Sequence, residues 1–230
     1  MRRSGTHWLG YLISNYILFL NDSENLLDNN GTAFKEVFHN SRNGIIWFGV
    51  ELAEHRVGTI DAQKRHYFYS HIKSAAENAS FFLGKRILLY SNPRDWTVPR
   101  HNNLQNRSDM NYPGGNLSNY LDSFMAEYYK AMTALRALCQ TEDDILVSYE
   151  ELVEDTPAAL RRVVHFLELP LDEDAINYSV ERSSVKSTKL QESQGMVIGR
   201  SLNGRSFVNS AQVGQWKSAM SKSDINFIDT

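Results

Sequence analysis

Near its beginning the chain reads Arg2-Arg3-Ser4-Gly5-Thr6-His7-Trp8-Leu9, a basic stretch that contains a glycine and runs directly into an apolar helical pattern. A helix N-terminus offers unpaired backbone N–H groups and a partial positive charge. Gly5 lets the backbone approach a ligand closely, and the neighbouring hydroxyls add hydrogen-bond donors. Arg3 adds a forked guanidinium that suits phosphate or sulfate. The stretch therefore predicts an anion-binding loop, although a capped helix behind a basic terminus fits the same residues.

Downstream of this loop, short apolar strands alternate with longer helices. The pattern predicts strands over 45–50, 86–90 and 145–149, and helices over 6–19, 61–83, 117–138 and 156–167. Two stretches, 100–116 and 183–209, lack regular periodicity and are predicted to be a mobile loop and a long surface excursion. The alternation is typical of an α/β fold in three layers, with helices flanking a mostly parallel central sheet. We expect a single domain over residues 1–230.

Composition excludes several classes of protein. The chain of 230 residues has 24 Lys plus Arg against 27 Asp plus Glu, and a net charge of −3 argues against a general nucleic-acid binder. One cysteine, Cys139, allows neither an intramolecular disulfide nor a cysteine-based metal site. The histidines lack ligand spacing, so we expect no metal. The sequence has no Gly-X4-Gly-Lys-Ser/Thr motif, which argues against ATP or GTP hydrolysis.

The opening stretch resembles the 5′-phosphosulfate loop of the sulfotransferases, in which Lys/Arg-Ser-Gly-Thr-Thr-Trp-Leu follows a strand. Three further blocks come in the order of that family. Residues 87–96 resemble the strand and turn that carry its 3′-phosphate site, and residues 145–152 resemble a strand-to-helix segment. Residues 212–217 resemble the C-terminal Val-Gly-Asp-Trp-Lys stretch. The resemblance therefore spans almost the whole chain.

The resemblance implies a P-loop-like fold and transfer of a sulfuryl group from 3′-phosphoadenosine 5′-phosphosulfate (PAPS) to a hydroxyl or amine, without a metal. Such an in-line displacement depends on positioned cations and N–H groups. Arg3 would act in catalysis by contacting the bridging oxygen of the leaving group. By this resemblance, the donor-binding residues are Arg3, Ser4, Gly5, Thr6, His7, Trp8, Ser91, Asn92, Arg94, Tyr149 and Trp216.

A base must take the proton of the acceptor. The family places a His or Glu just after its second strand. Here Glu51 is the first choice and His55 the second. The same residues also suit a solvated helix start, where acidic side chains are favoured.

The sequence departs from the family at the 3′-phosphate side. The family turn begins with an Arg and has a Ser eight positions later, whereas Ser91 and Pro99 stand here. Asn209-Ser210-Ala211 replaces an Arg-Lys-Gly stretch. Replacement cations could come from Arg94, Arg100, Arg200 or Arg205. Alternatively, the donor lacks a 3′-phosphate or donor binding is lost.

Only Met1 and Arg2 precede Arg3, whereas a phosphate loop needs a supporting strand. Either the natural chain starts further upstream, which we expect, or the sheet lacks its usual central strand. The apolar stretch 8–20 is too short to span a bilayer, and we expect no integral membrane segment. A cytoplasmic location is expected, or a lumenal one in the secretory pathway if the true N-terminus lies upstream.

The expected partner is a small-molecule or carbohydrate acceptor, not a nucleic acid. Its pocket would come from the loops 104–116 and 183–204, whose Asn, Gly and Arg content suits a polar acceptor. Two alternatives remain open at this point: a non-catalytic relative that binds a ligand, and a kinase-like nucleotide-dependent transferase.

Overall fold

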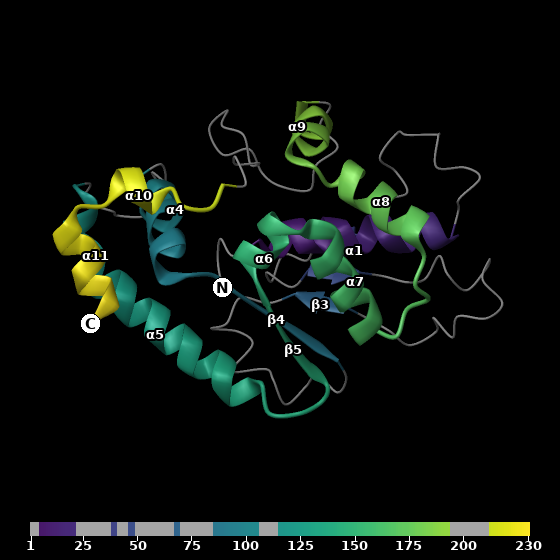
Figure 1. Cartoon of the computed structure of the whole chain (residues 1–230), viewed down its shortest axis with the longest axis horizontal. Helices are drawn as coiled ribbons and strands as arrows, with labels where there is room; N and C mark the ends of the chain where they lie inside the picture. Colours follow the sequence, from purple (N-terminus) through teal and green to yellow (C-terminus); the bar gives the residue numbers. More distant parts are fainter. Residues whose placement is uncertain are drawn as a thin grey trace. The chain divides into compact units, whose positions relative to one another are not determined.

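The computed structural model describes residues 5–21, 38–40, 46–48, 67–69, 85–105, 115–193 and 212–230, and Figure 1 labels most of their helices and strands. The chain divides into two compact units. The first unit comprises Met1–Thr6, His71–Glu154 and Gln212–Thr230, and the second comprises His7–Ser70 and Asp155–Ala211. Each unit is therefore assembled from segments that are far apart in the sequence.

A parallel pair of strands lies in the first unit. Strand β4 (Arg86–Tyr90) pairs with β5 (Asp144–Ser148), and Leu88 lies opposite Leu146 in the register. The connection contains helix α4 (Pro93–Gln105), the short 3-10 helix η4 (Leu117–Tyr120) and helix α5 (Leu121–Leu138). Helix α6 (Tyr149–Glu154) follows β5 without a loop. This strand–helix–strand arrangement confirms the predicted α/β class, because parallel neighbours require such a crossover.

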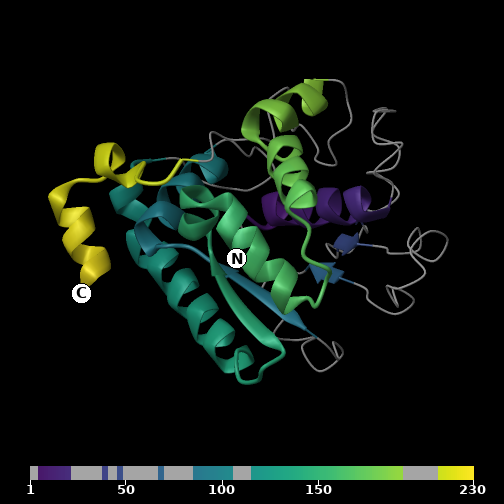
Figure 2. The ribbon, with the colours of Figure 1, turned by 45° about the vertical axis from the view of Figure 1, so that its right-hand side comes forward.

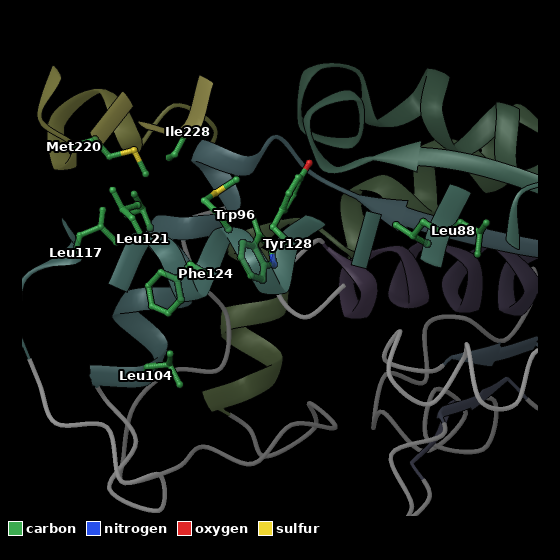
Figure 3. Packing of buried hydrophobic residues seen from close by; sticks show 12 residues of the cluster. Leu88, Trp96, Leu104, Leu117, Leu121, Phe124, Tyr128, Met220 and Ile228 are labelled. Carbon is green, nitrogen blue, oxygen red and sulfur yellow. The ribbon is translucent and has the colours of Figure 1, made fainter. Parts of the chain in front are cut away.

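The apolar core of the first unit stabilises α4 and α5. Figure 3 shows Trp96 of α4 next to Tyr128 of α5, and their ring centroids are 5.6 Å apart. Burying a large apolar side chain contributes about 1.5–3 kcal/mol. Met220, directly after helix α10 (Trp216–Ala219), and Ile228 of helix α11 (Lys222–Asp229) belong to the same cluster. Its buried members are Leu88, Trp96, Val98, Leu104, Leu117, Leu121, Phe124, Met125, Tyr128, Leu135, Met220 and Ile228.

The predicted mobile loop over 100–116 is wrong in its first part. Helix α4 continues through Pro99 to Gln105, and Leu104 near its end is buried in the cluster. An interior proline removes one helical hydrogen bond. Burial of Trp96, Val98 and Leu104 holds the helix together in spite of it. Residues 106–114 lie outside the described part of the chain.

Among its described residues, the second unit contains the helices α1 (Thr6–Asn21), α7 (Thr156–Phe166), α8 (Glu173–Arg182) and α9 (Val185–Ser193). Figure 2 shows α1 beside α8. The Ser179 hydroxyl donates to the Leu12 carbonyl at 2.6 Å, and the Tyr16 hydroxyl accepts from the Asp172 N–H at 3.1 Å. The predicted surface excursion from residue 183 is wrong over Val185–Ser193, because that segment is helical.

In the described part of the second unit, three short strands form an antiparallel sheet, in which β2 (Ile46–Phe48) lies between β1 (Phe38–Asn40) and β3 (Tyr67–Tyr69). Strand β2 confirms the centre of the strand predicted over 45–50, but its neighbours run antiparallel to it. The helix predicted over 61–83 is wrong at Tyr67–Tyr69. Tyr and Phe favour strands, and pairing with β2 outweighs the local helical periodicity. The rest of 61–83 lies outside the described residues.

None of the described helices combines the length and the apolar character that crossing a membrane requires.

Candidate functional site

The carboxyl ends of β4 and β5 meet at one edge of the parallel pair, where ligands of α/β proteins usually bind. The turn Ser91-Asn92-Pro93 follows β4, and Tyr149 begins α6 directly after β5. The Asn92 N–H donates to Glu150 Oε1 at 2.8 Å, so the turn and the start of α6 are hydrogen-bonded together. The two sequence blocks that resemble donor-binding segments therefore converge at this edge.

Gly5, the last residue before α1, packs against the start of α6. Its φ of +80° lies in the left-handed region, which disfavours residues with a side chain. A Cβ atom there would lie 2.8 Å from Tyr149 Cδ2 and 3.7 Å from Leu152 Cδ1. Both the backbone conformation and the contact therefore require a glycine. The structure thus brings together two predicted donor-binding residues, Gly5 and Tyr149.

The remaining loop residues are only partly described. Arg3 and Ser4 lie outside the described residues, as do the candidate bases Glu51 and His55. Thr6 and His7 form the first positions of α1, but their side chains are outside the described part. The roles predicted for these residues stay predictions.

The start of α6 carries two ionisable groups with shifted pKa values. Burial raises the pKa of Tyr149 to about 12, and the carboxylates of Glu150 and Asp95 add to the shift. The phenol is therefore neutral at physiological pH and remains a hydrogen-bond donor. Burial also raises the pKa of Glu150, and this effect outweighs the hydrogen bond from Asn92 N–H.

Ser91 opens the turn after β4 and is buried, with 1% of its surface exposed. Its hydroxyl has no hydrogen-bond partner among the described residues. Its carbonyl accepts a 2.9 Å hydrogen bond from Tyr128, whose pKa is raised to about 12 by burial. The turn thus offers a buried neutral hydroxyl at the position where the family has a cation.

Arg94 directly follows this turn, in the first turn of α4, and it pairs with Asp229 of α11. Arg94 Nε donates to Asp229 Oδ1 at 3.1 Å, and a second bond joins Nη2 to Oδ2. The guanidinium carbon lies 4.7 Å from the centre of the Trp216 ring, which is a cation–π distance. Arg94 and Trp216, both predicted donor-binding residues, are therefore brought together, but the charge of Arg94 is already paired.

The other candidate replacement cations are committed elsewhere or not described. Arg100 Nη2 forms a 3.1 Å ion pair with Glu127 Oε2 of α5. Arg200 and Arg205 lie outside the described residues. Pro99, inside α4, has no donor to offer.

Three carboxylates of the first unit, those of Asp95, Glu150 and Asp229, were not predicted to belong to the site. Asp95 Oδ1 accepts from the Gly214 N–H at 2.6 Å and anchors the segment that precedes Trp216. Glu150 directly follows Tyr149, so an acidic residue at a helix start after a strand was the available signal. Asp229 gave no local signal, because it lies 135 residues from its partner Arg94.

Trp8 belongs to the second unit, and its side chain makes a structural contact there. The indole Nε1 donates to the Ser183 carbonyl at 2.9 Å, where α8 ends. Asn15 Nδ2 donates to the Ser183 hydroxyl at 2.9 Å, and both Asn15 and Ser183 are buried. Ser183 was not predicted, because nothing in its local sequence indicates a partner in α1.

Solved structures of sulfotransferases resemble this chain. Retinol dehydratase in complex with androsterone and inactive cofactor PAP aligns with a TM-score of 0.60 and 14% identity, over 99% of this chain and 76% of that one. Retinol dehydratase in a complex with retinol and PAP gives a TM-score of 0.59 and 12% identity, over 100% and 77%. Mouse sulfotransferase SULT7A1 complexed with PAP gives 0.52 and 13%, over 64% of this chain and 55% of that one.

This chain therefore spans about half the length of the SULT7A1 chain. No curated protein sequence matches it significantly. The structural likeness shows that the fold is the P-loop-like α/β fold of these enzymes. The sequence profile of the sulfotransferase domain matches residues 1–230. On this match, the chain belongs to the sulfotransferase domain family.

Proposed function

We propose that the protein transfers a sulfuryl group from PAPS to a hydroxyl or amine of a small-molecule or carbohydrate acceptor. The observation that carries the proposal is the packing of Gly5 on Tyr149, next to the hydrogen bond between Asn92 and Glu150. This arrangement places Gly5, which has a left-handed backbone conformation, and the start of α1 beside the carboxyl ends of the parallel strands β4 and β5. Backbone N–H groups in such a place favour a phosphate.

The proposed roles follow the chemistry of the residues. Gly5 and the N–H groups at the start of α1 hold the 5′-phosphate, with Ser4, Thr6, His7 and Trp8 lining it. Arg3 stabilises the negative charge that develops on the bridging oxygen as the sulfur–oxygen bond to the donor breaks. Glu51 or His55 accepts the proton of the acceptor. Tyr149, protonated at physiological pH, donates a hydrogen bond to the donor nucleotide.

The structural neighbour retinol dehydratase was solved with androsterone and with retinol. Both are small molecules with a hydroxyl group, which supports an alcohol as the acceptor class. The Asn, Gly and Arg content of 104–116 and 183–204 favours a more polar molecule, such as a carbohydrate.

Calorimetry and a transfer assay test the proposal together. We expect 3′,5′-diphosphoadenosine to bind the full chain, and we expect the labelled sulfuryl group of PAPS to appear on an acceptor from a panel of alcohols, amines and sugars. The variant Arg3→Ala should lose transfer while keeping its circular dichroism spectrum. Preference for ATP with Mg²⁺ would instead indicate a kinase-like transferase.

A non-catalytic binding domain is the second candidate function. It is favoured by the neutral Ser91 in the turn and by Pro99 within α4, since the family has a cation and a hydroxyl there. Losing a charge-assisted hydrogen bond costs about 1.5–3 kcal/mol. Nucleotide binding without transfer to any acceptor of the panel would support this second candidate over the first.

A further inference from the structure

We propose that Arg94 is the cation that binds the 3′-phosphate of the donor, and that Asp229 competes with this phosphate for Arg94. Asp229 would then be a specificity-determining residue, because it lowers the preference of the site for 3′-phosphorylated over 3′-hydroxyl nucleotides. The inference rests on the proposed function, since it assumes that the edge of β4 and β5 binds a nucleotide.

The contacts around Arg94 hold its guanidinium in a position where it can bind an anion. The backbone N–H of Arg94 donates to Asn92 Oδ1 at 3.0 Å, which ties the residue to the turn. The Trp216 ring supports the guanidinium at 4.7 Å. The Arg94 side chain is 25% exposed, so a ligand can still reach it. The planar guanidinium of Arg94 can thus donate two parallel hydrogen bonds to two oxygens of one phosphate group.

The groups of the turn itself, and Arg100 of α4, do not supply this charge. Ser91 is neutral and buried. The Asn92 N–H is already bonded to Glu150, whose carboxylate would repel a phosphate. Arg100 has an 11% exposed side chain and is paired with Glu127. Among the described residues of the β4–α4 turn, Arg94 is therefore the cation that can respond to an anionic ligand.

Asp229 holds Arg94 weakly enough to be displaced. Its side chain is 46% exposed, and exposed ion pairs contribute little to stability. Asp229 is also the last residue of α11, where the negative end of the helix dipole disfavours a carboxylate. A phosphate group carries more charge than a carboxylate and offers more acceptor oxygens, so it can replace Asp229 at the guanidinium.

The test compares 3′,5′-diphosphoadenosine with 5′-AMP by isothermal titration calorimetry, using the full chain. Asp229→Asn should tighten binding of the diphosphate about two- to five-fold, as expected when a surface ion pair is lost. Arg94→Gln should weaken it about ten-fold or more, the effect of one charge-assisted contact. Neither change should alter 5′-AMP affinity by more than about two-fold, because that nucleotide has no 3′-phosphate.

Two further variants keep the result interpretable. Arg94→Lys retains the charge but not the fork, and it should recover part of the diphosphate affinity. Glu173→Gln is the matched control, because it breaks an exposed ion pair with Arg161 in the second unit and should change neither affinity. Thermal melts of each variant establish that it is folded.

The outcomes separate the inference from the proposed function. The decisive quantity is the affinity for 3′,5′-diphosphoadenosine divided by the affinity for 5′-AMP. If both nucleotides bind and Arg94→Gln leaves this ratio unchanged, the inference is overturned while nucleotide binding stands. A higher ratio in Asp229→Asn together with a lower ratio in Arg94→Gln supports the inference. If the unaltered chain binds neither nucleotide, the proposed function fails and this inference fails with it.

Discussion

Gly5 and Gly214 share a left-handed backbone conformation but differ in their surroundings. Their φ angles are +80° and +84°. A Cβ at Gly5 would lie 2.8 Å from the Tyr149 ring, whereas a Cβ at Gly214 would have its nearest neighbour, Lys217 Cε, at 3.7 Å. Comparing alanine substitutions at the two glycines therefore distinguishes the free-energy cost of a left-handed backbone from the additional cost of a steric clash with Tyr149.

We expect Gly5→Ala to destabilise the protein more than Gly214→Ala does. Both variants carry a backbone cost of about 1–2 kcal/mol, but only Gly5→Ala must also displace Tyr149. The measurement is the free energy of unfolding from urea titrations, with nucleotide affinity as a second readout. Equal losses in the two variants would show that the contact between Gly5 and Tyr149 is unimportant.

At the scale of elements, an ion pair fixes the register of β4 and β5. Arg86 Nη2 donates to Asp144 Oδ2 at 2.8 Å, and the Asp144 side chain is fully buried. The Thr141 hydroxyl also donates to Asp144 Oδ2 at 2.8 Å. Burial acts to raise the pKa of Asp144, but the hydrogen bonds from Arg86 and Thr141 outweigh it, so the pKa lies below the ordinary 3.8.

A lowered pKa predicts a specific dependence of stability on pH. The carboxylate of Asp144 contributes its full stabilisation above pH 3.8, and this contribution is lost as the pH falls through the lower pKa of the folded state. We expect Asp144→Asn to lose about 1.5–3 kcal/mol of unfolding free energy at neutral pH and less at low pH. Urea titrations across the acid range measure this, and a loss that does not vary with pH would contradict it.

Helix α4 contains the proline that stands where the family has a serine. Pro99 lies in the interior of Pro93–Gln105, where a proline is less favourable than alanine by about 3 kcal/mol. We expect both Pro99→Ala and Pro99→Ser to raise the thermal midpoint, since each restores a backbone N–H. If the 3′-phosphate binds near α4, only Pro99→Ser should also tighten the binding of 3′,5′-diphosphoadenosine. An equal gain of affinity in both variants would exclude a role for the hydroxyl.

At the scale of the whole molecule, the C-terminal segment completes a unit that begins far earlier in the chain. Ile228 of α11 is 4% exposed and belongs to the cluster around Trp96, whereas its neighbour Phe227 is 43% exposed. We expect Ile228→Ala to lose about 2–5 kcal/mol of unfolding free energy. Phe227→Ala should lose much less, because that ring is already in contact with solvent.

Chemical denaturation of the two variants measures their free energies of unfolding. If Ile228→Ala is as mild as Phe227→Ala, then α11 is not part of the core of the first unit. In that case the ion pair of Asp229 with Arg94 would also lack a fixed support.

The sequence by itself determined the local elements and the family. Helical periodicity predicted α1, α5 and α7, and apolar runs predicted β4 and β5, because these signals depend on residues close together in the chain. The loop before α1 indicated a phosphate site for the same reason, since glycine, hydroxyl and guanidinium groups carry their chemistry wherever the chain folds.

Only the tertiary structure decided which charges face one another. The pairing of Arg94 with Asp229, the contact of Gly5 with Tyr149 and the anchoring of Gly214 by Asp95 join segments more than a hundred residues apart. No local pattern encodes such contacts. Burial likewise decided that α4 continues past Pro99, because packing of apolar side chains outweighs weak local preferences. That Val185–Ser193 is helical was also seen only in the structure.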